Sequence, residues 1–238
     1  MFKELITESL PKFQTIRPMT KTKLWFRPIL VKEEKKILAA QELGKKDEIV
    51  KCVSELLDSC YEHLNAEKLP TFEFDYLFIQ LRMKSISESV NAKFTCPETE
   101  EKIDLTIDLG QIQVVGVNEY KDKVKITDQL VITFRPPTYN DLLEISDDLG
   151  IEELSKLAAK CIVKVDTPTD SYEVDKSHFS DLNEMVKNMT KAQYDKIIKY
   201  FDQIPTYNFK YTYKTSDGVE RAILISGIED FFTLASVI

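Results

Sequence analysis

The sequence predicts an α+β fold, in which a helical unit packs with antiparallel β-hairpins and no doubly wound, nucleotide-binding sheet is present. Helical patterns of apolar residues fill residues 29–88. Alternation of apolar and polar residues, which is typical of half-buried strands, follows around residues 89–135 and 206–226. The chain has only 6 glycines in 238 residues, which is sparse for a nucleotide-binding α/β enzyme.

The composition predicts a soluble globular protein, because 43% of the residues are hydrophobic and 30% are charged. The net charge of −8 argues against a nucleic-acid backbone or an anionic membrane surface as the main partner. The N-terminal sequence lacks the basic and apolar regions of a signal peptide. No CxxC pair occurs, so we expect a reducing compartment with four small core cysteines: Cys52, Cys60, Cys96 and Cys161.

The segment Leu69–Ser89 is expected to form the central helix of the fold. Thr71 is predicted to cap this helix, and Pro70 to help start it. Arg82 and Lys84 near its end suit the negative end of the helix dipole. Apolar residues cover most of its circumference, so the rest of the domain must bury it. These residues are Phe72, Phe74, Tyr76, Leu77, Phe78, Ile79, Leu81 and Met83.

The segments before the central helix are predicted to be an arm, a strand and two helices. Residues 1–20 form the arm, because their prolines prevent a long helix. A strand is expected at Thr22–Phe26, and Ile29–Leu43 forms a helix that Gly44 ends. Its apolar positions are Ile29, Leu30, Ile37, Leu38 and Leu43. Asp47 is expected to cap the next helix, whose buried face comprises Ile49, Val50, Val53, Leu56, Leu57 and Cys60.

Strands are predicted to dominate the segment after the central helix. Val90–Cys96 and Ile103–Leu109 alternate as the strands of a hairpin, joined by a loop at Pro97–Glu101. Ile112–Val117 continues the β region. Lys123–Phe134 is either another strand pair or one long strand.

The C-terminal part is predicted to contain helices followed by a hairpin. Helices are expected at Tyr139–Asp147, at Ile151–Val163, from Ser180 or Asp181, from a cap at Thr190 through Phe201, and after Gly227. Thr167–Asp175 is expected to be a connector. The final hairpin joins Tyr207–Thr215 and Val219–Ile225 through Ser216-Asp217-Gly218. By these patterns the chain divides into residues 1–88, 89–137 and 138–238, or forms one continuous domain.

One tripeptide occurs twice, each time between a predicted strand and a predicted helix. Phe26-Arg27-Pro28 and Phe134-Arg135-Pro136 each close a β segment, because proline ends strand pairing. Coincidence and internal duplication both explain the repeat. For Arg27 and Arg135 we favour pairing with a carboxylate or carbonyl at the strand end over contact with a partner.

No catalytic, metal or cofactor site emerges from the sequence. Neither His63 nor His178 has a His, Cys or Glu partner at the spacing typical of metal ligation. Cys96 stands where a zinc-knuckle hairpin carries its first ligand, but residues 98–102 supply no second cysteine. Phosphate-binding, dinucleotide-binding and nucleophile motifs are absent from the sequence. The alternative to a non-enzymatic protein is a hydrolase that uses scattered carboxylates.

Two stretches in the first half of the chain resemble a known phage family. Residues 26–35, FRPILVKEEK, resemble the opening signature of the baseplate hub assembly proteins of large contractile-tailed bacteriophages, the T-even type and its cyanophage relatives. Residues 69–85 are similar to the second signature of that family. The resemblance spans roughly residues 20–135. Its motif residues, with structural or partner-contact roles, are Phe26, Arg27, Pro28, Lys32, Glu33, Glu34, Pro70, Phe72, Tyr76, Gln80, Arg82 and Lys84.

The resemblance implies a non-enzymatic assembly role. Such proteins are needed to build the central hub of the tail baseplate, and they bind other tail proteins as an assembly factor, a chaperone or a minor hub subunit. The alternative within this class is a permanent structural subunit of the virion. The implied location is the host-cell cytoplasm during assembly or the virion baseplate, with no nucleic acid, membrane or cofactor involved. Some members carry a further cysteine in the hairpin that begins at Cys96; this chain lacks it, so no metal role is expected there.

Overall fold

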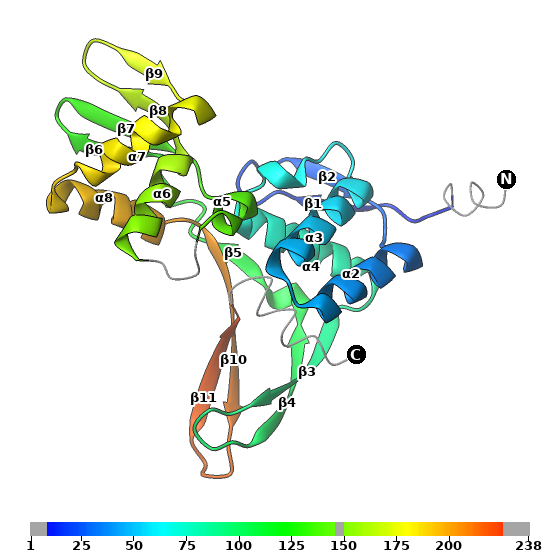
Figure 1. The fold of residues 1–238 in the computed structure, drawn as a ribbon. Helices are drawn as coiled ribbons and strands as arrows, with labels where there is room; N and C mark the ends of the chain where they lie inside the picture. The colour runs from blue at the N-terminus through cyan, green and yellow to red at the C-terminus, as the bar shows by residue number, and fades with distance from the viewer. Residues whose placement is uncertain (1–8, 146–149, 226–238) are drawn as a thin grey trace. The chain divides into compact units, whose positions relative to one another are not determined.

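The computed structural model describes residues 9–145 and 150–225 and confirms the α+β class (Figure 1). The chain forms two compact units, and the second is inserted into the sequence of the first. The first unit comprises residues 1–115 and 206–238, and the second comprises Gly116–Pro205. The segments 89–137 and 138–238 suggested by the sequence patterns therefore each contribute to both units.

Within residues 9–115 and 206–225, three α-helices provide the helical part of the first unit. They are α2 (Val31–Leu43), α3 (Lys46–Cys60) and α4 (Thr71–Ser85), with a short 3-10 helix η1 (Ala66–Lys68) before α4. Gly44 ends α2 in the left-handed conformation with φ +66°, as predicted. The cap prediction for α3 is wrong, because the cap is Lys45 and Asp47 lies inside the first turn.

The helix α4 is the buried centre of the first unit, as its apolar circumference predicts. Six of its apolar side chains are buried: Phe72, Phe74, Leu77, Phe78, Ile79 and Leu81. The predicted cap is wrong, because Pro70 is the N-cap and Thr71 is the first helical residue. Arg82 and Lys84 lie in the last turn of α4, as predicted, and the side chain of Arg82 is buried. Burial also extends to Glu73 and Asp75.

The helix α2 is less buried than its sequence suggests. The helix begins at Val31, so Ile29 and Leu30 precede it. Of its predicted apolar face, Ile37 is buried, whereas Leu38 and Leu43 are exposed. The predicted inner face of α3 is confirmed in its main positions: Val50, Val53, Leu56, Leu57 and Cys60 are buried.

The N-terminal arm contains a strand that the sequence patterns did not predict. Strand β1 (Phe13–Ile16) pairs antiparallel with β2 (Lys23–Phe26). The strand is short, and its prolines lie on either side of it, at Pro11 and Pro18. Proline at the flanks leaves the hydrogen bonds of the ladder intact, so the proline argument excluded a long helix without excluding a strand.

Two β-hairpins of the first unit pack against each other. The predicted hairpin is present as β3 (Ser89–Thr95) and β4 (Lys102–Asp108). The predicted C-terminal hairpin is present as β10 (Thr206–Lys214) and β11 (Glu220–Ile225), and β10 also pairs with β5 (Gln113–Val115). A 3-10 helix η2 (Leu109–Gln111) separates β4 from β5. The rings of Phe94 and Tyr213 pack edge-to-face with their centroids 5.7 Å apart, and this contact joins the two hairpins.

The described part of the second unit combines a four-stranded antiparallel sheet with four α-helices. The sheet order is β6 (Lys123–Thr127), β7 (Leu130–Phe134), β8 (Ile162–Asp166) and β9 (Ser171–Glu173). The helices are α5 (Tyr139–Leu143), α6 (Ile151–Cys161), α7 (Phe179–Lys187) and α8 (Lys191–Asp202), with a 3-10 helix η3 (Lys176–His178) before α7.

Several predicted boundaries in the second unit need correction. The helix expected through Val163 ends at Cys161, and the chain continues as β8. Its residues Ile162, Val163 and Val165 are β-branched, which favours a strand. The expected connector contains β9, and α7 begins at Phe179. Helix α5 ends at Leu143.

One cap prediction in the second unit is confirmed. The hydroxyl of Thr190 accepts from the backbone N–H of Gln193, and the Gln193 side chain accepts from the N–H of Thr190 at 2.8 Å. The helix expected after Gly227 lies outside the described residues.

Truncating Phe78 to alanine should destabilise the protein by about 3–5 kcal/mol, because the change removes buried apolar area and leaves a cavity. Phe78 is only 2% exposed. Urea unfolding followed by circular dichroism measures the loss. The matched control is Leu38→Ala on α2, where the leucine is 40% exposed and the loss should be far smaller. Equal stability of Phe78→Ala and wild type would contradict the central role of α4.

Candidate functional site

The first repeated tripeptide forms an ion pair that joins β2 to α2. The Arg27 guanidinium donates to both carboxylate oxygens of Glu33, Nη1 to Oε2 at 2.9 Å and Nη2 to Oε1 at 2.8 Å. Nη1 also donates to the carbonyl of Pro28 at 2.9 Å. Glu33 accepts in turn from the backbone N–H of Leu30 at 2.9 Å and so caps the start of α2. One carboxylate therefore neutralises the arginine and begins the helix.

The same arginine is held against the end of α3. Its backbone N–H donates to the carbonyl of Cys60 at 3.1 Å, and Phe26 forms a β-bridge with Tyr61. Both Phe26 and Cys60 are buried. Burial raises the pKa of the Cys60 thiol to about 12, so the thiol is protonated at neutral pH. The strand β2 and the helices α2 and α3 thus meet at this arginine.

The second tripeptide repeats this arrangement inside the second unit. Arg135 donates to both oxygens of Asp141, Nη1 to Oδ2 at 2.6 Å and Nη2 to Oδ1 at 3.0 Å, and Nη1 donates to the carbonyl of Pro136 at 3.2 Å. Asp141 accepts from the backbone N–H of Thr138 at 2.8 Å, which caps α5. The backbone N–H of Arg135 donates to the carbonyl of Cys161 at 2.8 Å, at the end of α6.

The correspondence between the two sites extends well beyond the tripeptide. In each site, the carboxylate lies six residues after the arginine. The residue whose backbone N–H donates to this carboxylate lies three residues after the arginine. Each arginine N–H meets the last residue of a helix, which is a buried cysteine with a thiol pKa raised by burial to about 12. Coincidence explains a repeated tripeptide but not this shared set of contacts. The geometry favours duplication of a hairpin–helix–helix module. This module consists of β1, β2, α2 and α3 in the first unit, and of β6, β7, α5 and α6 in the second.

The expected pairing of both arginines with a carboxylate is confirmed, and each also binds a carbonyl. Sequence reasoning named Glu33 as a motif residue without naming its partner, and it missed Asp141. A signal for both existed: an acidic residue stands six positions after arginine in each copy. The two cysteines carried no such signal, because the helices that bring them back differ in length.

The two signature stretches meet within the first unit. The backbone N–H of Ile29 donates to the hydroxyl of Ser85 at 2.9 Å, which links the first signature to the end of α4. Burial lowers the pKa of Arg82, and the nearby charge of Glu34 opposes that shift. Phe72 is buried, whereas Pro70, Tyr76 and Gln80 are half-buried. Two motif lysines are exposed: Lys32, and Lys84, which pairs with Glu88 at 2.7 Å.

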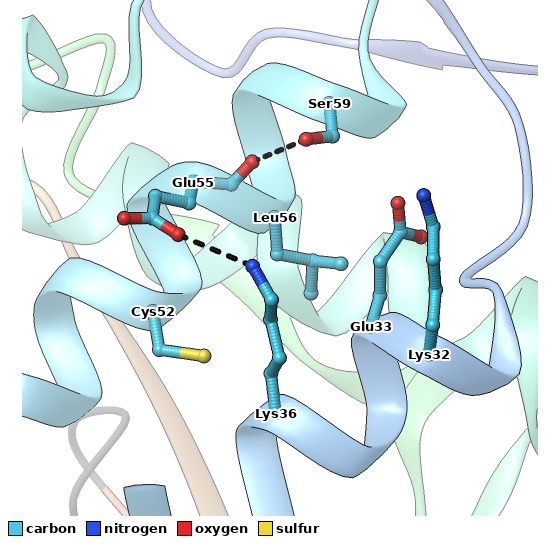
Figure 2. Close-up of a pocket in the computed structure, with 7 residues that line it drawn as sticks. All are labelled: Lys32, Glu33, Lys36, Cys52, Glu55, Leu56 and Ser59. Carbon is cyan, nitrogen blue, oxygen red and sulfur yellow. Dashed lines mark hydrogen bonds and ion pairs between the residues drawn. The ribbon is translucent and has the colours of Figure 1, made fainter.

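A small hollow lies between α2 and α3, and Glu33, the partner of Arg27, is among its lining residues (Figure 2). Its lining combines both charges with a thiol: Lys32, Glu33, Lys36, Cys52, Glu55, Leu56 and Ser59. Lys36 and Glu55 face each other across it at 3.8 Å. The volume of about 130 Å³ is well below the roughly 300–1,000 Å³ of typical small-molecule pockets. The hollow is therefore too small to hold a typical small-molecule ligand.

Metal-binding clusters and membrane-spanning helices are both absent from the described residues. Across residues 9–145 and 150–225, no three His, Cys, Asp or Glu side chains gather closely enough to hold a metal ion. Over the same ranges, no helix is both long and apolar enough to cross a membrane.

Comparison with protein-family models identifies a bacteriophage baseplate protein. The matching family is described as T4 bacteriophage base plate protein, and the match covers residues 10–233. The chain belongs to this family, and the resemblance found in its sequence is confirmed. No curated protein and no solved structure matches the chain. Membership implies a structural or assembly role in the baseplate and contact with other phage baseplate proteins.

Replacing either arginine by alanine should lower the free energy of unfolding by about 1.5–3 kcal/mol, because a partly buried carboxylate then loses charge-assisted hydrogen bonds. Lysine should not restore the loss, because it cannot make the two parallel bonds of a guanidinium. The control is Lys191→Ala, which breaks an exposed pair with Asp195 and should cost about 0–1 kcal/mol. Full thermal stability of Arg27→Ala or Arg135→Ala, combined with loss of a binding partner, would contradict the structural role.

Acid should weaken the first ion pair. Burial acts to raise the pKa of Glu33, but the hydrogen bonds from Arg27 and Leu30 outweigh it, so the pKa lies below its ordinary value of 4.5. A depressed carboxylate pKa adds stability above the ordinary pKa, and this is lost as the pH falls through the folded value. Wild type should therefore exceed Glu33→Gln in unfolding free energy at neutral pH, and the difference should shrink below pH 4.5.

Urea titrations of wild type and Glu33→Gln at several pH values measure this difference. The control is Glu67→Gln, which changes an exposed carboxylate on η1. Its difference from wild type should stay small throughout. A difference for Glu33→Gln that is constant with pH would refute the electrostatic contribution of this pair.

Proposed function

We propose that this protein is a non-enzymatic assembly factor of the baseplate central hub, acting by protein–protein binding as a chaperone or a minor hub subunit. Membership of the baseplate family carries the proposal, because it implies contact with other baseplate proteins. The proposed site of action is the host-cell cytoplasm during assembly. The motif residues, from Phe26 to Lys84, act in this proposal mainly by fixing the first unit that presents the binding surface.

Exposed apolar side chains on short strands support a binding role. Trp25 is 46% exposed on β2, and Ile16 is 48% exposed on β1. In the register of this hairpin, Gln14 faces Trp25 and Ile16 faces Lys23, so Trp25 and Ile16 share one face of the pair. Single exposed apolar residues are common, but a tryptophan beside an isoleucine on a two-stranded ribbon is a suitable contact for another protein.

The alternative is a permanent structural subunit of the virion baseplate. Family membership supports it equally, because a baseplate role includes both structure and assembly. The two alternatives differ in the composition of the finished particle: a chaperone leaves, whereas a subunit remains.

Deleting the gene should block hub assembly. If the protein acts as a chaperone, purified wild-type virions should contain far less than one copy of it per baseplate. Quantitative mass spectrometry of purified particles, with known baseplate subunits as internal standards, measures the copy number. Co-purification from infected cells should recover hub proteins during assembly. A fixed stoichiometric amount in finished particles would establish the structural subunit instead. Normal hubs without the gene would refute both alternatives.

A further inference from the structure

The two copies of the hairpin–helix–helix module continue differently after the buried cysteine. In the second unit, the chain leaves Cys161 and forms β8 along Val131–Phe134 of β7, where Phe134 pairs with Ile162 and Val131 pairs with Asp166. The added strand covers the edge of β7 that β6 leaves free. A strand in this position is therefore compatible with the module.

In the first unit, the same pairing begins and then stops. Phe26 bridges to Tyr61, and the N–H of Glu62 donates to the carbonyl of Trp25 at 2.9 Å. The next residue, His63, has a φ of +57°, and this left-handed conformation turns the chain away from the strand. Among the described strands, β2 pairs only with β1. The position that β8 fills in the second unit is thus filled only at its first residues.

Backbone geometry shows which groups face this position. In a strand, the N–H and C=O groups of one residue point to the same edge of the strand. Those of the next residue point to the opposite edge. The carbonyl of Trp25 faces Glu62, away from β1, so the N–H of Trp25 and both peptide groups of Lys23 face the same way. Lys23 and Trp25 are both exposed. We call these groups of Lys23–Trp25 the open edge of β2.

Charge limits which strand can add to this edge. Lys21 and Lys23 stand exposed at its start, and neither forms an ion pair within the described chain. A second copy of this edge would bring like charges together, which disfavours self-pairing. An acidic segment would instead find opposite charge next to the exposed rings and methyl groups of Trp25 and Ile16.

We propose that the open edge of β2 binds an extended acidic segment of another baseplate protein by strand addition. The segment runs antiparallel to β2 and occupies the position that β8 holds against β7 in the second unit. Main-chain hydrogen bonds supply affinity, and the lysines with the Trp25–Ile16 face select an acidic and apolar sequence. This inference rests on the proposed function for its partner and adds the site and the mode of binding.

The test compares Lys23→Pro with Lys23→Ala. Both variants remove the charge, but only proline removes the N–H that faces the open edge. Because this N–H points away from β1 and Lys23 is the first residue of β2, proline is tolerated there. The baseplate proteins of the phage, each expressed alone, are titrated calorimetrically against wild type and both variants. Circular dichroism checks that both variants keep the wild-type fold.

At least one baseplate protein should bind wild type. Lys23→Ala should weaken the affinity for this protein by up to about fivefold, which is the range of an exposed charge contact. Lys23→Pro should weaken it by a further factor of about ten or more, through the lost hydrogen bond and the ring that blocks the edge. Hydrogen exchange on the wild-type complex provides a second measurement that needs no variant: the amides of Lys23 and Trp25 should become protected.

Equal binding by the two variants would overturn strand addition, and so would unprotected amides in the complex. Absence of binding by every baseplate protein would overturn the inference too. Failure of the proposed function has a different signature, because hubs would then assemble without the gene. If deletion blocks assembly but Lys23→Pro supports it fully, the function stands and the open edge is excluded as the site.

Discussion

The bidentate pairing of an arginine with the carboxylate that starts the next helix is the interaction on which the rest of this structure depends. In each unit it fixes three things at one point: the end of a strand, the first turn of a helix and the last residue of a second helix. Two parallel charge-assisted bonds impose an orientation that a lysine could not. Glu33 and Asp141 are nearly covered, at 12% and 11% side-chain exposure, so breaking a pair would leave a carboxylate largely removed from water.

The central helix of the first unit follows from this arrangement, because its apolar circumference needs cover on all sides. The helix α3, held at its end by Arg27, provides part of that cover, and β1, β5 and β10 contact α4 as well. The buried charge of Glu73 on α4 has hydrogen-bond partners. Glu73 is fully buried and accepts from Arg17 at 2.5 Å and from the N–H of Met19 at 2.9 Å. The loop between β1 and β2 is thereby attached to the core.

The two copies of the module share their contacts around the arginine and differ in the segment after the cysteine. The contacts around each arginine are retained, since losing any of them would leave a buried polar group unpaired. The segment after the cysteine can differ between the copies, because a strand edge on the surface can pair with water or with another chain. In the second unit that segment completes a sheet, and in the first it leaves the open edge of β2 exposed.

The sequence by itself determined the elements whose signals are local. The apolar face of α4, the left-handed stop at Gly44, the capping box at Thr190 and the Ser216-Asp217-Gly218 hairpin all depend on residues within a few positions of each other. Tertiary structure decided what depends on distant partners. The short strand β1 forms because β2 lies beside it. The segment after Cys161 is the strand β8, and not the end of a helix, because it pairs with the edge of β7. Arg82 is buried despite its charge because α4 is covered on that side. Cys60 and Cys161 reach their arginines only after two helices of unequal length have packed, and no local pattern encodes that return.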